Sequence, residues 1–190
     1  MKFADALEKA TARFESDSFF ERIKDENPTM IKHLPLLQKI NKCGFLTTES
    51  QAGNREKGIS SKDGKPYELI ERAFITGFML EKDAVEFIKN MAVHTDKNAI
   101  YVPVCADTPG SLDIPLTLVK RKSDIQIETH MSTSLPKSTE ASFRKMVHLN
   151  ASEKAVFIFC WDSKWCRSAS DKNGLFTQVY RIISTVKKLR

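Results

Sequence analysis

Residues 42–53 constrain the fold more than any other segment, because a helix ends there, a strand begins and a polar stretch opens. Apolar side chains recur every three to four positions over residues 30–40, which predicts a helix. Gly44 is the residue type expected just beyond its C-terminus. Residues 45–48, Phe-Leu-Thr-Thr, then predict a short strand.

The partner of that strand is predicted at residues 67–79, the strongest strand pattern after the loop. We expect it to pair antiparallel with residues 45–48. The polar residues 49–66 between them predict a long hairpin connection, with Asp63-Gly64 as a tight turn. Gly77 indicates a bulge or a close backbone approach.

The remaining periodicities predict alternating helices and strands. Helices are expected at 3–23 with a break near 16–18, at 28–43 divided at Pro35, and at 81–94, 138–150 and 175–189. Strands are expected at 99–105, followed by a turn at 107–110, and at 155–161. Residues 114–130 predict either one long strand or two strands joined at 121–123. This order predicts an α+β fold: one globular domain over residues 1–190, with a single mixed, mostly antiparallel sheet of about five strands and helices packed on it.

The charge is uneven along the chain. The first 95 residues are balanced, so the second half carries the whole net charge of +6. This basic half is suited to nucleic acid or an acidic protein partner, provided that residues 120–122 and 187–190 share one side; otherwise it is a solvated basic face. No apolar run approaches the roughly 20 residues that span a bilayer, so no membrane is expected. The N-terminus lacks the apolar core of a signal peptide, which favours the cytoplasm.

No complete catalytic or cofactor motif is present. Residues 58–65 resemble a phosphate-binding loop, but the glycines are separated by five residues and Lys65 precedes a proline rather than a hydroxyl residue. The four cysteines are scattered without close ligand pairs, so neither zinc nor another cofactor is expected. Whether the protein is an enzyme stays open at this point.

Two other patterns have alternative interpretations. On a strand, Asp124, Gln126, Glu128 and His130 share one face and could hold a metal or act as acid and base; they could equally be the solvated face of a half-buried strand. In residues 161–167, two tryptophans interleaved with Lys164 and Arg167 could stack on bases, or could close one end of the core.

The best-placed candidate site is a group of polar side chains on the predicted hairpin. It consists of Thr47, Thr48, Ser50, Gln51, Glu71 and Arg72. Hydroxyls, an amide and a guanidinium are suited to a polar or anionic ligand. The alternative for Glu71 and Arg72 is a structural ion pair or a solvent-facing rim.

Residues 37–53 and 71–78 resemble a family characterised by the pattern Gly-Phe-hydrophobic-Thr-Thr-x-Ser-Gln-x-Gly. We associate this pattern with proteins of large DNA viruses and of some actinobacteria. The resemblance covers about residues 30–80, and Ala52 occupies the variable position before the last glycine, where proline is expected. It implies no particular activity; a viral member would act in the host cytoplasm or in the virion.

Two hypotheses follow from the sequence. The first is a non-enzymatic binding or accessory protein that uses its basic C-terminal half or its long loop to contact a partner. The second is an enzyme or a small-ligand-binding protein, with a polar or anionic ligand held near residues 47–51 and Arg72.

Overall fold

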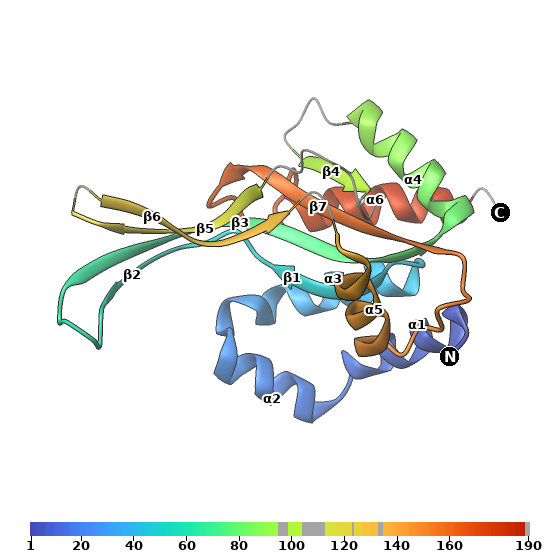
Figure 1. The fold of residues 1–190 in the computed structure, drawn as a ribbon, viewed down its shortest axis with the longest axis horizontal. Coiled ribbons are helices and arrows are strands. Elements are labelled where there is room, and N and C mark those ends of the chain that lie inside the picture. Colours follow the sequence, from blue (N-terminus) through green and yellow to red (C-terminus); the bar gives the residue numbers. More distant parts are fainter. Residues whose placement is uncertain (95–98, 104–112, 123, 133–134, 189–190) are drawn as a thin grey trace.

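A computed structural model describes residues 1–94, 99–103, 113–122, 124–132 and 135–188 (Figure 1). Within these ranges the fold is α+β, as the sequence predicts, with helices packed on an antiparallel sheet. The predicted turn at 107–110 and the end of the predicted strand 99–105 lie outside the described residues.

The described part of the sheet has seven strands rather than about five, and its strand pairs are antiparallel. The strand order is β4-β7-β3-β5-β6, and both β1 and β2 pair with β3. The bounds are β1 Leu46–Gln51, β2 Arg55–Ile59, β3 Pro66–Leu80, β4 Ala99–Pro103, β5 Asp113–Arg121, β6 Asp124–Ser132 and β7 Ala155–Trp165.

The central strand β3 serves two parts of the molecule. Its second half, residues 72–80, lies between β1 and β7 and is almost entirely buried. Its first half, residues 66–71, lies between β2 and β5. Together with β6 these segments form an arm that projects from the body (Figure 1). We define the arm as residues 55–71 and 117–129, apart from residue 123.

The helices follow the predicted periodicities closely. Their bounds are α1 Phe3–Arg13, α2 Asp17–Glu26, the 3-10 helix η1 Pro28–His33, α3 Leu34–Lys42, α4 Glu81–His94, α5 Lys137–Met146 and α6 Leu175–Lys188. The predicted break near 16–18 is confirmed, since Ser16 caps α2 by accepting a hydrogen bond from the Phe19 N–H at 3.3 Å. The predicted division near Pro35 is also confirmed: Pro35 lies in the first turn of α3.

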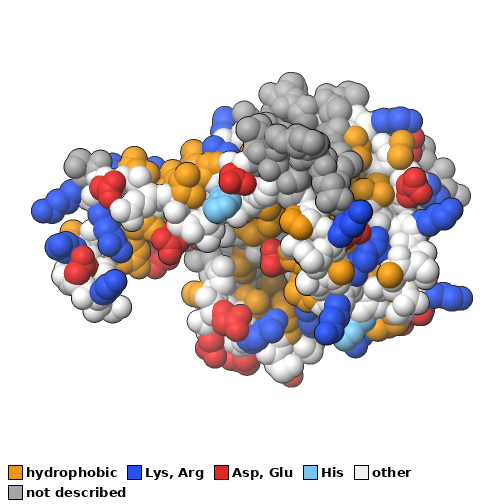
Figure 2. All heavy atoms as spheres, in the orientation of Figure 1, with side chains coloured by type: hydrophobic (Ala, Val, Ile, Leu, Met, Phe, Trp, Pro, Cys, Tyr) orange, Lys and Arg blue, Asp and Glu red, His pale blue; other side chains and the backbone are white. Residues whose placement is uncertain are grey.

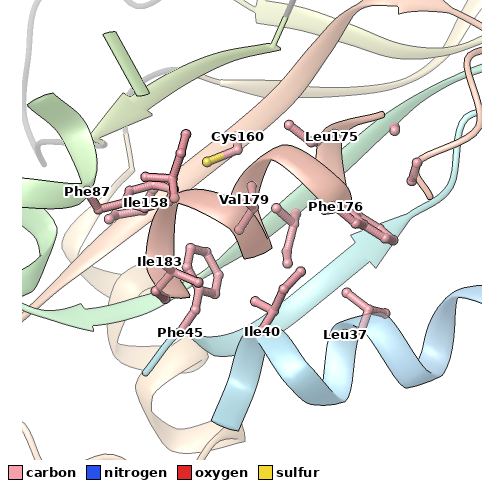
Figure 3. Close-up of a cluster of buried hydrophobic side chains, with 14 of the residues drawn as sticks. Leu37, Ile40, Phe45, Phe87, Ile158, Cys160, Leu175, Phe176, Val179 and Ile183 are labelled. Atoms are coloured by element: carbon pink, nitrogen blue, oxygen red, sulfur yellow. The ribbon is translucent and has the colours of Figure 1, made fainter. Parts of the chain in front are cut away.

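Strand residues alternate between two cores, one on each face of the body of the sheet. On one face, Ile75 and Cys160 pack against α3, α4 and α6; Figure 3 shows Val179 and Ile183 of α6 projecting into this core. On the other face, Phe78 and Phe157 pack with residues of α1 and α5. No helix of the described residues is both long enough and apolar enough to cross a membrane.

The helix-to-strand junction at residues 42–53 is held by buried hydrogen bonds. The side-chain Nδ2 of Asn41, at the end of α3, donates to the Leu37 carbonyl at 2.9 Å and to Thr47 Oγ1 at 2.8 Å. Its Oδ1 accepts from the Thr47 N–H at 3.1 Å. Gly44 connects the two elements with a φ of 108°, which is unfavourable for other residues.

The expectation that residues 49–66 form one long loop is wrong. β1 continues to Gln51, and Arg55–Ile59 form β2 in continuous register with β3. Only a short connection follows, and there the predicted tight turn is confirmed: the Gly64 N–H donates to the Ser60 carbonyl at 2.8 Å.

The close approach predicted at Gly77 is also found, because a Cβ there would lie 2.4 Å from the Leu46 carbonyl oxygen. The irregular register in this pair lies in β1, between Thr47 and Glu49.

Candidate functional site

The six predicted site residues fall into two groups in the structure. Thr47, Thr48 and Ser50 line a pocket beside β1. Gln51, Glu71 and Arg72 do not line it, because they lie further along the hairpin where the body meets the arm. The two groups therefore have to be considered separately.

In the second group, Arg72 is packed rather than offered to a ligand. Its guanidinium stacks on the Trp165 ring, with Cζ 4.1 Å from the ring centroid. Burial lowers the pKa of Arg72, and the negative charge of Asp162 partly opposes this shift. The buried Nε has no hydrogen-bond acceptor among the described residues.

Gln51 and Glu71 also have local roles. Gln51 Nε2 donates to the Arg72 carbonyl and to Thr117 Oγ1, each at 3.3 Å, and so connects β1 to β5 across β3. Burial, followed by the nearby charge of Glu56, raises the pKa of Glu71. Glu71 and Arg72 point to opposite faces of β3 by strand alternation, and both are partly buried. Among the described residues neither forms an ion pair, so the structural ion pair that was the alternative for them is not found.

The first group belongs to a cavity of about 420 Å³, here called the α2–β1 pocket. Its apolar lining comes from α1, α2, η1, α3 and α5: Phe14, Phe19, Ile23, Met30, Leu34, Leu37 and Met146. Thr47, Thr48 and Ser50 supply hydroxyl side chains from β1. In Figure 2 a hollow with a hydrophobic floor lies between α2 and α5.

Two arginines at this pocket were not singled out from the sequence. Arg13, at the end of α1, and Arg22, on α2, both place their guanidinium groups over the Phe19 ring, at 4.9 and 5.2 Å from its centroid. Partial desolvation, followed by the positive charge of Arg22, lowers the pKa of Arg13. Arg22 follows Arg13 by nine positions, and the chain turn at Ser16 brings the two side chains together. The spacing of residues along one helix therefore does not predict that they meet.

The free end of the arm carries a group of exposed cations. Residues 57–65 and 120–124 place six basic side chains against two acidic ones at its free end. The basic residues are Lys57, Lys62, Lys65, Lys120, Arg121 and Lys122, and all are exposed. In Figure 2 the end of the arm furthest from the body shows several blue Lys and Arg side chains, with red Asp and Glu side chains among them.

The ends of the two hairpins lie close to one another. Asp63, in the first hairpin, has its pKa lowered chiefly by a hydrogen bond with Ser60, and Arg121 of the second hairpin is among the further causes. Lys65 Nζ lies 3.7 Å from Asp63 Oδ2. Among the described residues, no other of the six cations forms an ion pair within 4 Å. Carboxylates still lie beside several of them, since Glu68 is opposite both Lys57 and Lys120 in strand register and Asp124 is opposite Arg121.

One face of the arm has a shallow recess of about 370 Å³ between the hairpins. Leu69 pairs with Val119 at its centre, and Tyr67 and Arg121 lie two positions further along the same face. The Tyr67 ring covers Gly58, where a Cβ would lie 2.7 Å from ring atoms.

The opposite face of the arm is also open to solvent. Ile125 and Ile127 have exposed fractions of 57% and 61%.

The basic residues of the second half do not form one surface. Residues 120–122 lie on the arm, whereas Lys187 and Lys188 end α6 at the far end of the molecule (Figure 1). Lys187 Nζ donates to the Lys42 carbonyl at 2.6 Å. Instead, Lys57, Lys62 and Lys65 of the neutral first half join the cations of 120–122.

The segment 161–167 is largely structural. Trp161 is buried and stacks on Phe159 at 5.1 Å. Asp162 is completely buried and accepts a hydrogen bond from the Arg167 Nε at 2.6 Å and another from its Nη2. These contacts are those expected of residues that close one end of a core.

The polar face of β6 also lacks a metal-like grouping. Gln126 Nε2 donates to Asp124 Oδ2 at 2.8 Å, and His130 Nε2 lies 3.8 Å from Asp113 Oδ2. Among the described residues, no three His, Cys, Asp or Glu side chains are grouped closely enough to hold a metal ion.

Comparison with models of known protein families finds no match to this chain, and comparison with curated protein sequences finds none either. Arguments about function therefore rest on the geometry of the arm and of the α2–β1 pocket.

Proposed function

We propose that the protein binds single-stranded nucleic acid with its arm. The observation that carries this proposal is the cluster of six exposed Lys and Arg side chains at the free end of the arm. Asp63 and Asp124 lie in the same segments, and Glu68 pairs in register with both Lys57 and Lys120. Phosphate groups are the partners that such a cluster attracts most strongly, because each contact releases counterions from the nucleic acid.

The dimensions of the arm favour a single strand over a duplex. The arm is four strands wide, in the order β2-β3-β5-β6. Three spacings of roughly 4.8 Å give a backbone width of about 14 Å before side chains are added. The major groove of B-DNA is about 12 Å wide and admits a two-stranded ribbon, so it does not accommodate the whole arm.

The recess on one face of the arm supplies the remaining elements of a single-strand site. Tyr67 offers an aromatic ring on which a base stacks, and Arg121 lies on the same face. Ser60 and Ser61 at the end of the recess add hydroxyl groups. In this arrangement the bases lie across the sheet and the phosphates lie along the basic end.

The test is the salt dependence of binding, measured by fluorescence anisotropy with labelled single-stranded DNA and RNA 12-mers and with the matching duplex. If all six cations contact phosphates, the logarithmic slope for a single strand is about −4, and affinity falls roughly two-hundredfold between 50 and 200 mM salt. Duplex binding is expected to be weaker.

Matched variants locate the interaction. Lys62→Gln combined with Lys122→Gln removes two cations from the arm and reduces the slope by about 1.4. The control, Lys24→Gln with Lys89→Gln, removes two exposed lysines from α2 and α4 and leaves the slope unchanged. Equal effects of the two pairs, or no binding at 50 mM salt, would show that the arm is not a nucleic-acid site.

Tyr67 tests the stacking part of the proposal separately. Tyr67→Phe keeps the ring and retains affinity, whereas Tyr67→Leu loses about 1 to 3 kcal/mol of binding free energy with the salt slope unchanged. If the leucine and phenylalanine variants bind equally well, bases do not stack at this recess.

A further inference from the structure

The α2–β1 pocket is separate from the arm, and its chemistry differs. Its mouth holds two guanidinium groups, its β1 side holds hydroxyl groups and its walls are apolar. The inference drawn from it is independent of nucleic-acid binding.

The arginine pair is the most unusual feature of the pocket. Arg13 and Arg22 share one aromatic ring, and neither forms an ion pair with a described residue. Glu26 is the one carboxylate among the lining residues, and it too forms no ion pair with a described group. Two neighbouring positive charges repel each other, and an anion placed between them removes this repulsion.

The β1 side of the pocket adds hydrogen-bonding groups. Ser50 pairs with Ile75 of β3 through its backbone, whereas its side-chain hydroxyl makes no hydrogen bond to a described residue and is available to a ligand. By contrast, Thr48 Oγ1 is within 2.7 Å of Thr76 Oγ1, and Thr47 Oγ1 accepts from Asn41. Among the described strands, β1 pairs only with β3. The edge of β1 that does not face β3 is therefore unpaired in the described part of the sheet, on the side where the pocket lies.

The walls favour an apolar body on the ligand. Phe19, Met30, Leu34 and Leu37 are buried residues that also line the pocket. The cavity volume of about 420 Å³ lies within the roughly 300 to 1,000 Å³ typical of small-molecule sites. Apolar walls with a few convergent polar groups are the usual composition of such sites.

We propose that the α2–β1 pocket binds an anionic amphiphile: a small molecule with one carboxylate or phosphate head group on an apolar body. The head group lies between Arg13 and Arg22, where planar guanidinium groups pair well with either oxyanion. The body lies against Phe19, Met30 and Leu37, and Ser50 donates a hydrogen bond to a ligand oxygen.

The direct test uses isothermal titration calorimetry with four probes that share an eight-carbon body. These are octanoate, octyl phosphate, 1-octanol and octylammonium. The two anions are expected to bind at least tenfold more tightly than the alcohol, and the ammonium least well. The stronger of the two anions identifies the preferred head group. Equal affinity for octanoate and octanol would overturn the proposal.

Variants then assign the binding to this pocket. Arg13→Gln and Arg22→Gln are each expected to weaken anion binding about tenfold, the size of one charge-assisted hydrogen bond. Arg22→Lys keeps the charge and retains part of the affinity. Lys24→Gln, on the same helix but outside the lining, is the matched control and leaves affinity unchanged.

The apolar wall is tested with an exposed residue so that folding is preserved. Met146 lines the pocket and has an exposed fraction of 46%, so Met146→Ala shortens the wall without opening the core. It is expected to weaken octanoate and octanol binding by the same factor, because both have the same body. If Met146→Ala, Arg13→Gln and Arg22→Gln each bind octanoate as tightly as the wild type, the anion binds elsewhere and the proposal is overturned.

Discussion

The side chain of Asn41 provides the sharpest test of how the helix-to-strand junction is held. Asn41 is completely buried, and it satisfies both the N–H and the hydroxyl of Thr47, which is also buried. Asn41→Ala leaves these two groups of Thr47 without their partner. Each unsatisfied buried group costs about 1 to 3 kcal/mol, so we expect the free energy of unfolding to fall by about 2 to 5 kcal/mol.

The matched variants separate this effect from simple truncation. Thr47→Val removes only the hydroxyl, and Asn41 keeps its bond to Leu37 and to the Thr47 N–H, so a loss of about 1 kcal/mol is expected. Asn90→Ala removes an asparagine on α4 that also donates to a carbonyl four residues earlier, but in a bond exposed to solvent. Its expected cost is below about 0.5 kcal/mol.

Urea denaturation followed by circular dichroism measures all three variants. With a slope of about 2 kcal/mol/M, Asn41→Ala lowers the unfolding midpoint by about 1 to 2.5 M. If Thr47→Val destabilises the protein as much as Asn41→Ala, or if the two losses add fully in the double variant, the two side chains do not act as a hydrogen-bonded unit.

Two further predictions concern the body of the molecule. Gly77→Ala places a Cβ against the Leu46 carbonyl oxygen, so the backbone of β1 has to move to make room for it. The variant is therefore expected to unfold at a lower urea concentration. An unchanged urea midpoint would mean that β1 can shift at no cost. Burial lowers the pKa of His33, so the folded protein binds fewer protons than the unfolded chain near pH 6.5. The free energy of unfolding therefore falls as the pH drops through about 6.5. In His33→Asn, thermal unfolding measured from pH 5 to 8 is expected to show a smaller fall with decreasing pH. Parallel curves for the variant and the wild type would contradict this prediction.

Most of the fold could be predicted from the sequence because local signals agree with the tertiary contacts. The helices have clear apolar periodicity, and Ser16 and Pro35 mark divisions that the structure shows. The sequence does not predict β2, because residues 55–59 contain only one large apolar side chain, that of Ile59. This segment becomes a strand because it pairs with β3, and its own composition gives no strand signal.

The candidate site could be predicted only in part. Of the predicted residues, Thr47, Thr48 and Ser50 line the α2–β1 pocket, and hydroxyl residues at the start of a polar stretch are a pattern that the sequence shows locally. The arginine predicted to accompany them was Arg72, since it lies on the paired strand. The guanidinium groups that actually join them are those of Arg13 and Arg22, which arrive through helix packing that no spacing rule describes.

The continuity of β3 has a mechanical consequence. Residues 66–80 form one uninterrupted strand, half in the arm and half in the buried body. A force applied to the arm along this strand passes directly into the body, because no break in the strand separates the two. The force acts in shear on the backbone hydrogen bonds from β3 to β1 and β7, and it acts on all of them at the same time. Such loading resists extension far better than the one-by-one opening of a hairpin. The arm is therefore expected to transmit force to the core without bending much. A ligand that displaces the tip of the arm is expected to strain the buried segment of β3 from Phe74 to Phe78.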